Sequence, residues 1–354
     1  MSSRRIRTLA LAATALLAAT ALTACGKSDD KSSASGDAST IRLGYFPNIT
    51  HAPALVGVNK GFYKDALGST KLETKTFNAG GDALQALLSG AIDATYMGPN
   101  PAITGWAQTQ GTGLKIIAGS TSGGAGLVVQ PTITGVQDLK GKKVATPQLG
   151  NTQDVALRSW LKGQGLTTDT QGGGDVSITP AANSATLQSF AQGSIAGAWL
   201  PEPYLSQLVL QSKGKLLVDE KTLWPQGQFV TTQLVVTQSF LKKYPDTVKK
   251  LLQGQLKSID YIASNKADAQ AAANAQIQSL TGKPLKDNVL QAAFANLSFT
   301  NDPIASSLYT GAQHAEAVGL LKTVDLKGIY DLDPLNALLK AAGQPTVSDA
   351  APAS

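Results

Sequence analysis

Residues 84–97, Leu-Gln-Ala-Leu-Leu-Ser-Gly-Ala-Ile-Asp-Ala-Thr-Tyr-Met, and residues 187–200, Leu-Gln-Ser-Phe-Ala-Gln-Gly-Ser-Ile-Ala-Gly-Ala-Trp-Leu, carry the same signals in the same order. Each begins with apolar residues at helical spacing and reaches a glycine, Gly90 or Gly193, that is suited to end a helix. Each then continues into a short apolar run typical of a buried strand. Two similar helix–strand units about 100 residues apart predict two similar α/β lobes.

Both predicted strands close on an aromatic residue and enter a proline-rich corner. Tyr96 precedes Gly98-Pro99-Asn100-Pro101, and Trp199 precedes Pro201-Glu202-Pro203, with one gap needed to align the corners. Ligands of open α/β sheets bind beyond the carboxyl ends of the strands. We therefore predict a ligand cleft between two lobes, lined by these corners. The alternative is that two short α/β segments resemble each other by chance.

The N-terminus predicts export. Residues 1–25 place three arginines before an apolar run from Leu9 to Leu22, and the segment ends in Leu22-Thr23-Ala24-Cys25. This pattern is typical of a secretory signal peptide, and its end resembles the lipobox of bacterial lipoproteins, in which the cysteine is lipidated. A transmembrane anchor is the alternative, but the run is short for a bilayer and rich in alanine. We expect a membrane-anchored protein on the extracytoplasmic face.

Cysteine and charge counts exclude several kinds of protein. Cys25 is the only cysteine, which excludes an intramolecular disulfide, a cysteine nucleophile and a thiolate metal site in the folded part. The formal net charge is +6, of which three arginines belong to the predicted signal, leaving about +3. Since no basic run with interleaved aromatic residues occurs, we expect no nucleic-acid partner.

Composition and pattern divide the remaining chain. Residues 26–39 contain no large apolar side chain and are predicted to be a flexible tether, and residues 343–354 a frayed tail. Residues 40–124 should form the first part of lobe 1, and the glycine-rich run at its end should be the first crossing between lobes. Residues 125–228 should form lobe 2. Residues 229–342 should return to lobe 1 with a β-rich segment followed by helices.

Common catalytic and metal-binding motifs are missing. The chain has no Gly-x-Ser-x-Gly elbow, P-loop, dinucleotide fingerprint or His-Glu-x-x-His sequence. Only two histidines exist, and His314 lies in a predicted amphipathic helix as a surface or packing residue. His51 lies in a predicted cleft loop and is a candidate hydrogen-bonding partner of a ligand. We expect no metal site, no cofactor and no catalytic residue.

Helix starts that follow strands through small polar residues form the candidate ligand site. Helix N-termini present unpaired amides and a partial positive charge, so several converging starts bind an anion without Arg or Lys. Any one of them, taken alone, is an ordinary turn of an α/β protein. The candidates are Asn48, His51, Gly80, Gly81, Asp82, Asn100, Ser122, Gly150, Asn151 and Thr152. Asp82 is also a candidate helix N-cap, and the Asn151-Thr152 pair can cap the helix that follows it.

Aromatic and acidic residues could recognise the rest of a ligand. Tyr45 and Trp199 are candidates to stack on an apolar tail. Glu202 could pair with a ligand ammonium, or could serve only as an acid at a helix start. The predicted cleft loops contain no Arg or Lys, which favours a monoanion over phosphate.

Several spaced motifs resemble the substrate-binding proteins of nitrate, sulfonate and taurine ABC importers. The motifs are the lipobox, Gly44-Tyr45-Phe46-Pro47-Asn48-Ile49-Thr50-His51-Ala52-Pro53, Gly90-Ala91-Ile92-Asp93-Ala94, Gly98-Pro99-Asn100-Pro101-Ala102, Pro147-Gln148-Leu149-Gly150-Asn151-Thr152 and Trp199-Leu200-Pro201-Glu202-Pro203. The resemblance implies a type II periplasmic-binding fold with two α/β lobes, two crossovers and a ligand cleft. It also implies a membrane permease and an ATPase as partners.

The resemblance leaves the ligand open. We expect a non-enzymatic, monomeric protein that binds an organosulfonate, either an aliphatic sulfonate or taurine. Nitrate and a thiamine-pyrimidine precursor are alternatives on the same fold. A pyrimidine synthase of this fold needs a cysteine-rich iron motif, which is missing here. A hydrolase using His51 with Glu202 is a weaker alternative. Ala196 stands where the first repeat has Asp93, a departure that we expect to affect a turn and not the ligand.

Overall fold

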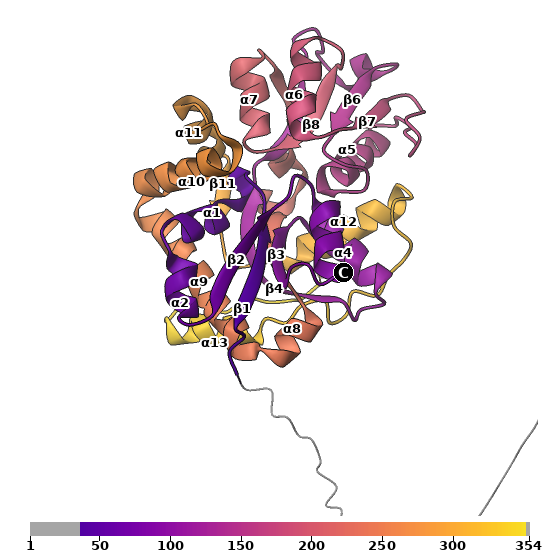
Figure 1. The fold of residues 1–354 in the computed structure, drawn as a ribbon. Coiled ribbons are helices and arrows are strands. Elements are labelled where there is room, and N and C mark those ends of the chain that lie inside the picture. The colour runs from indigo at the N-terminus through magenta and orange to yellow at the C-terminus, as the bar shows by residue number, and fades with distance from the viewer. Residues whose placement is uncertain (1–35, 352–354) are drawn as a thin grey trace, which may run out of the picture. The chain divides into compact units, whose positions relative to one another are not determined.

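The computed structural model describes residues 36–351 and contains two β-sheets flanked by helices (Figure 1). The first sheet has the strand order β11-β4-β10-β3-β1-β2. Its strands are β1 (Thr40–Tyr45), β2 (Lys71–Thr76), β3 (Ala94–Met97), β4 (Leu114–Gly123), β10 (Val230–Thr237) and β11 (Leu297–Phe299). The second sheet has the order β7-β6-β8-β5-β9. Its strands are β5 (Ala125–Val129), β6 (Lys143–Thr146), β7 (Ser177–Pro180), β8 (Gly197–Pro201) and β9 (Lys215–Asp219).

The two sheets share one topology. In the first, β1 pairs in parallel with β2 and β3, and in the second, β6 pairs in parallel with β7 and β8. The next strand is antiparallel in both sheets: β10 beside β3, and β5 beside β8. These antiparallel strands follow the crossings, because β5 comes after β4 of the other sheet and β10 after β9. The predicted α/β two-lobe fold is confirmed, and we call the elements around the two sheets lobe 1 and lobe 2.

Helices cover both faces of each sheet. Those of lobe 2 are α5 (Thr152–Gly163), α6 (Asn183–Ala191), α7 (Tyr204–Gln211) and the short 3₁₀ helix η2 (Val136–Leu139). Those of lobe 1 are η1 (Ile49–His51), α1 (Ala52–Asn59), α2 (Phe62–Leu67), α3 (Gly80–Leu88), α4 (Pro99–Gln108), α8 (Gln238–Lys243), α9 (Pro245–Ser264), α10 (Lys266–Thr281), α11 (Asp287–Ala295), α12 (Ala305–Ala317) and α13 (Asp333–Ala341). No helix within residues 36–351 is both long and apolar enough to cross a membrane.

Strand alternation builds the core of lobe 2. Along β8, Trp199 packs with Val144 and Leu157 on one face of the sheet, while Ala198 and Leu200 belong to a second cluster on the other face. Successive side chains of a strand point to opposite faces, so a short apolar run fills both layers. This explains why the run Gly197–Pro201 reads as continuously apolar.

Two segments join the lobes. The first crossing is Gly124, which lies between β4 and β5, and both Gly123 and Gly124 have positive φ, at 80° and 69°. Glycine adopts this conformation without the strain that a Cβ would cause. The return passes through η3 (Glu220–Leu223) and η4 (Pro225–Gly227) into β10. A crossing in the glycine-rich run and a β-rich return at residues 229–237 were both expected from the sequence.

Parts of the sequence-based assignment are wrong at residue level. Ala38, placed in the flexible tether, is 4% exposed. Its backbone N–H donates to the Thr247 hydroxyl, and its carbonyl accepts from the Thr70 hydroxyl, so the chain is fixed before residue 40. These hydrogen bonds involve the backbone of Ala38, so the composition of the segment, with its small side chains, gave no sign of them. Val347, placed in the frayed tail, is also fixed, because its backbone N–H donates to Asn336 Oδ1 (2.8 Å) and its carbonyl accepts from Asn336 Nδ2 (3.0 Å). Strand β11 lies in the gap between the helical patterns predicted up to Ala295 and from Ile304. The predicted signal peptide and the predicted lipidation site Cys25 lie outside the described residues.

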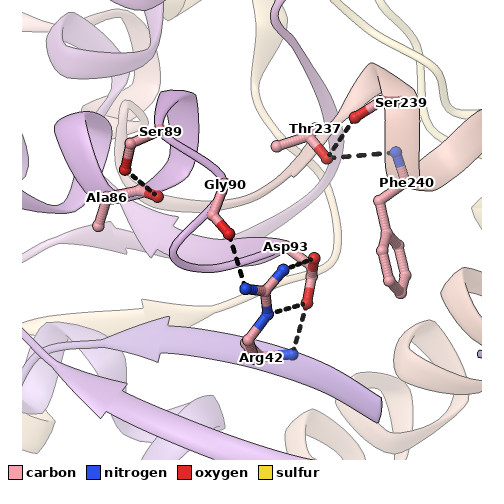
Figure 2. Close-up of polar contacts among 8 residues, drawn as sticks. All are labelled: Arg42, Ala86, Ser89, Gly90, Asp93, Thr237, Ser239 and Phe240. Atoms are coloured by element: carbon pink, nitrogen blue, oxygen red, sulfur yellow. Dashed lines mark hydrogen bonds and ion pairs between the residues drawn. The ribbon is translucent and has the colours of Figure 1, made fainter. Parts of the chain in front are cut away.

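The repeat's Asp93 has a structural role. Its carboxylate accepts hydrogen bonds from the Arg42 backbone N–H (2.8 Å), Nε (2.9 Å) and Nη2 (2.6 Å), as Figure 2 shows. Arg42 also donates to the Gly90 carbonyl at the end of α3 (2.7 Å). Asp93 therefore ties the start of β3 to β1, at the amino ends of these strands.

Candidate functional site

A small cavity lies where the carboxyl ends of β1, β3, β6 and β8 meet the beginning of β10. Its volume is about 40 Å³. Its lining comes from both lobes and from the segment that returns to lobe 1: Phe46, Asn48, Thr50, His51, Gly80, Gly98, Pro101, Asn151, Thr152, Gln153, Pro201, Thr231 and Thr232. All of these residues have side chains that are apolar, hydroxyl, amide or imidazole. The site is the one that the strand ends of an α/β sheet predict.

His51 gives the lobe 1 wall a neutral donor. The ring is 2% exposed, and this burial lowers its pKa to about 3. It stacks on Phe46 at 4.3 Å, and its Nδ1 accepts a hydrogen bond from the Phe46 backbone N–H at 3.3 Å. In a neutral imidazole whose Nδ1 accepts, Nε2 carries the proton and can donate. His51 is therefore uncharged at physiological pH, and Asn48, which is 5% exposed, adds an amide to the same wall.

The first turn of α5 forms the lobe 2 wall. Asn151 is the N-cap, as the sequence predicted, and its Oδ1 accepts from the Asp154 N–H at 3.1 Å. The N–H groups of Thr152 and Gln153 belong to the first turn, where the helix supplies no acceptor. The Thr152 hydroxyl is buried and has no hydrogen-bond partner within residues 36–351. A buried polar atom without a partner is unfavourable, so this hydroxyl is available for a ligand.

The two walls touch each other. The Gly81 N–H donates to Gln148 Oε1 across the cleft at 2.9 Å. A Cβ built on Gly98 would lie 2.5 Å from the Thr152 Oγ1, so any larger residue at position 98 would displace the Thr152 side chain. The cleft is therefore closed in this structure, and two glycines permit the close approach.

Some predicted residues line the cavity and others support it. Asn48, His51, Gly80, Asn151 and Thr152 line the cavity, as expected from the sequence. Gly81 makes the cross-cleft bond, and Gly150, with φ 75°, donates its N–H to Asp154 Oδ2 at 2.9 Å. Asp82 is not an N-cap, because α3 begins two residues earlier and Ala79 occupies the cap. Its side chain is exposed.

The structure does not bring Tyr45 and Trp199 to the cavity. Tyr45 is fully buried in lobe 1, and its hydroxyl accepts from Gln276 Nε2 at 3.1 Å. Trp199 is fully buried in lobe 2, and its indole N–H donates to Glu220 Oε2 at 2.8 Å. The position of each ring at a strand end did not reveal on which side of its sheet it lies. In both cases the ring packs into the hydrophobic core of its lobe and not toward the cleft.

Asn100, Ser122 and Glu202 also have partners elsewhere. Asn100 Nδ2 donates to the Gly311 carbonyl of α12 at 3.5 Å. Ser122 Oγ accepts from the Phe229 N–H at 3.3 Å, next to the crossings. Glu202 is fully buried, and its carboxylate accepts from Asn296 Nδ2 (2.7 Å), Ser206 Oγ (2.8 Å) and the Ser206 N–H (3.2 Å). Burial raises the Glu202 pKa, an effect that these hydrogen bonds oppose.

Sequence reasoning missed part of the lining. Phe46 and Gln153 are neighbours of residues that were singled out, so a wider window around each helix start would have included them. Thr50 lies in the motif Gly44–Pro53 noted above but was not named as a site residue. Thr231 and Thr232 carry no local signal. They reach the cavity because β10 returns from lobe 2 and enters the first sheet beside β3.

Comparison with known proteins now defines the family. A profile described as the NMT1-like family matches residues 34–277, more than half of the chain. The chain belongs to the NMT1-like family. It is 27% identical over 197 residues to a taurine-binding periplasmic protein of Escherichia coli (strain K12), which covers 56% of this chain and 59% of that protein. It is 25% identical over 309 residues to a putative aliphatic sulfonates-binding protein of Bacillus subtilis (strain 168), covering 85% and 87%.

Solved structures share the fold. The alkanesulfonate-binding protein SsuA from Xanthomonas axonopodis pv. citri, bound to MOPS, matches with TM-score 0.70 and 18% identity over 84% of this chain and 100% of that chain. The periplasmic nitrate-binding protein NrtA from Synechocystis PCC 6803 matches with TM-score 0.73 and 18% identity over 87% and 90%. The predicted resemblance to this group of binding proteins is confirmed at the level of family and fold.

Proposed function

We propose that this chain is the extracytoplasmic solute-binding component of an ABC importer and binds a small organosulfonate between its lobes. Family membership supports the transport role, since relatives are named for binding taurine and aliphatic sulfonates. The observation that carries the ligand class is the chemistry of the cavity. A buried Thr152 hydroxyl, which has no partner among the residues that the structure describes, lies beside first-turn amides in a lining without a charged side chain.

This lining suits a monoanion. A sulfonate carries one permanent charge and three acceptor oxygens, which amides and hydroxyls can satisfy through directed hydrogen bonds. The N-terminus of α5 adds a partial positive charge. A phosphate dianion would bring a second charge into a buried site without a cation, which costs free energy. Phosphate should therefore bind more weakly than a sulfonate.

The size of the closed cavity favours nitrate as the second candidate. One ordered water needs roughly 10–15 Å³ of such space, so a cavity of about 40 Å³ holds only a few heavy atoms. Nitrate, or the head group of a sulfonate, fits this limit. A taurine or alkyl tail requires the lobes to close less tightly around it. A thiamine-pyrimidine precursor is much larger and is the least favoured of the three.

The test is calorimetric titration of the chain beginning at residue 26 with taurine, ethanesulfonate, nitrate and phosphate. We expect a sulfonate to bind most tightly. The substitution Thr152→Val, which replaces the hydroxyl by a methyl group of similar size, should weaken binding roughly tenfold, the value of one hydrogen bond to a charged group. Thr281→Val, at an exposed position at the end of α10, is the matched control. Phosphate binding tighter than both sulfonates, or nitrate alone binding, would overturn the sulfonate assignment.

Glu202 sharpens the choice between taurine and alkyl sulfonates. If Glu202 pairs with the taurine ammonium, as the sequence hypothesis has it, Glu202→Gln weakens taurine alone. Its bonds to Asn296 and Ser206 favour the other result, an equal effect on taurine and ethanesulfonate. A selective loss of taurine would establish that the side chain turns toward the ligand.

The remaining partners follow from the same proposal. The protein is a monomer held to the outer face of the membrane by lipidated Cys25, and it delivers the ligand to a permease driven by an ATPase. Cys25→Ala should release the protein from the membrane fraction or block its processing. A variant that matures normally and stays with the membrane would exclude this anchor.

A further inference from the structure

A buried ion pair lies directly behind the cavity wall formed by α5. The side chains of Asp154 and Arg158 are 0% and 1% exposed, and Arg158 Nε donates to Asp154 Oδ2 at 3.0 Å. Arg158 is fixed at its far end by a hydrogen bond from Nη1 to the Asp169 carbonyl at 2.6 Å. Because both partners are out of water, the strength of their charges is little reduced by solvent.

Asp154 holds the loop that leads to the cavity. Its Oδ1 accepts from the Thr146 hydroxyl at 2.9 Å, and its Oδ2 accepts from the Gly150 N–H at 2.9 Å. These bonds join the last residue of β6 to the end of the loop 147–150, whose Gln148 makes the cross-cleft contact with Gly81. The carboxylate therefore positions both the loop and the first turn of α5.

The same carboxylate is badly placed for an anion-binding wall. Asp154 follows Thr152 by two residues, which is about 3 Å along a helix axis. A full negative charge this close to the first-turn amides would oppose the partial positive charge of the helix and repel a bound anion. The cavity lining has no charged group to offset it. Arg158 is the one cation that contacts the Asp154 carboxylate in the described structure.

We infer that Arg158 determines the charge specificity of the cavity: its guanidinium neutralises the positioning carboxylate Asp154, so that the α5 wall accepts an anion. The inference rests on the proposed function, since it assumes an anionic ligand. It separates two tasks that the pair performs. Asp154 positions the loop 147–150 and the first turn of α5. Arg158 neutralises the Asp154 carboxylate, which would otherwise repel a bound anion.

Neutralising each partner in turn provides the test. The affinity for ethanesulfonate is measured by calorimetry for wild type, Arg158→Gln, Asp154→Asn and the double variant. Arg158→Gln leaves an unpaired carboxylate behind the wall, so binding should weaken roughly tenfold or more, and added salt should restore little of it because salt screens buried charges weakly. Asp154→Asn leaves an unpaired cation, so its affinity should fall less than that of Arg158→Gln. The double variant restores neutrality and should bind more tightly than Arg158→Gln.

Arg158→Lys keeps the folding question apart from the charge question. It preserves the positive charge while losing the guanidinium geometry, and should bind within a fewfold of wild type. If Arg158→Gln does not fold, the affinities of Arg158→Lys and Asp154→Asn still decide the matter. A double variant weaker than both single variants, an Asp154→Asn variant as weak as Arg158→Gln, or loss of binding in a folded Arg158→Lys variant would mean that the pair only supports the fold. Wild type that binds no anion would overturn the proposed function, and this inference with it.

Discussion

The two copies of the repeat have the same frame but different attachments. In α3–β3–α4 and in α6–β8–α7, a helix ends at a glycine with positive φ and a strand enters the centre of its sheet. The backbone at Asp93 donates to the Arg42 carbonyl (2.9 Å), and that at Ala196 donates to the Lys143 carbonyl (2.8 Å). The first copy adds an ion pair at this point and the second does not. The frame therefore does not depend on the acid.

The aromatic residues at the strand ends differ in what they contact. The Tyr96 hydroxyl shares a hydrogen bond with the Tyr63 hydroxyl (2.6 Å) and donates to Gln255 Oε1 (2.7 Å). These groups form an uncharged hydrogen-bond network beneath the first sheet. The Trp199 indole bonds the carboxylate of Glu220, which also accepts from the Trp224 indole at 3.4 Å. Lobe 2 therefore contains a buried carboxylate at the point where lobe 1 has two tyrosine hydroxyls and an amide.

The corners after the strands also differ in use. The first corner contributes Gly98 and Pro101 to the cavity, whereas the second contributes Pro201 and directs Glu202 to Asn296, the C-cap of α11. Most polar groups of the cavity come from η1, the start of α5 and β10, which lie outside the repeat. The repeat supplies the scaffold, and segments before, between and after its two copies supply most of the ligand chemistry.

The largest expected effect is a pH dependence carried by Glu220. Burial raises its pKa to about 7, from 4.5, against the opposing indole hydrogen bonds. The folded state therefore binds the proton more strongly than the unfolded state, and stability is lost as pH rises from about 4.5 through 7. Between pH 5 and 8 this contribution is about 2–3 kcal/mol of unfolding free energy.

Urea unfolding at several pH values, for wild type and Glu220→Gln, measures this contribution. The difference between the two curves isolates Glu220 from other acids. Tyr96→Phe, in the matching place of lobe 1, should give a profile parallel to wild type, because the pKa of Tyr96 is raised well above 10 by burial. Parallel curves for Glu220→Gln and wild type would exclude a raised pKa at Glu220.

Gly98→Ala should separate closure from folding. The added Cβ would lie 2.5 Å from Thr152 Oγ1, so the lobes can close only if that side chain moves. We expect ligand affinity to fall roughly 10- to 100-fold, about 1.4–2.8 kcal/mol. Gly163→Ala, where nothing lies within 4 Å of the new Cβ, is the control and should bind like wild type. Calorimetry measures the ligand affinity of both variants. Equal affinities would show that the contact between position 98 and Thr152 does not limit closure of the lobes.

Asp93→Ala makes the first copy like the second. It removes the carboxylate from Arg42, whose side chain is 40% exposed, so part of the lost interaction is replaced by water. We expect a loss of about 1–2 kcal/mol in unfolding free energy and unchanged ligand affinity. Asp65→Ala, whose exposed contact to Lys257 is 4.0 Å long, should change stability little. A weakened ligand affinity in Asp93→Ala would link this end of the sheet to the cavity.

Ala196→Asp makes the opposite change and should have the smallest effect. The new carboxylate would lie near the exposed Lys143, the counterpart of Arg42. Surface ion pairs contribute about 0–1 kcal/mol, so we expect a slight stabilisation that disappears in high salt. Ala196→Asn removes the charge but keeps the shape, and should show no salt effect. A large destabilisation would mean that the turn itself excludes the acid.

Local sequence signals were enough to predict the two-lobe α/β frame. Helical spacing, the glycines at helix ends and the apolar strands predicted two α/β lobes, and the crossing at Gly124 and the return into β10 were expected from composition. These signals work because they reflect backbone preferences and burial of neighbouring residues, which few distant contacts override. The N-cap Asn151 was predicted for the same reason, whereas Asp82 failed because α3 begins earlier at Gly80.

The sequence by itself determined the fold class, the repeat, the absence of cationic residues from the cleft loops, and several helix starts at the cavity. Only the tertiary structure decided that Trp199 and Tyr45 face the core, that Glu202 bonds Asn296, and that Thr231 and Thr232 join the lining. The physical reason is that a strand end presents residues to two faces and to its edge. Which of these meets a ligand depends on elements that pack there from far away in the chain.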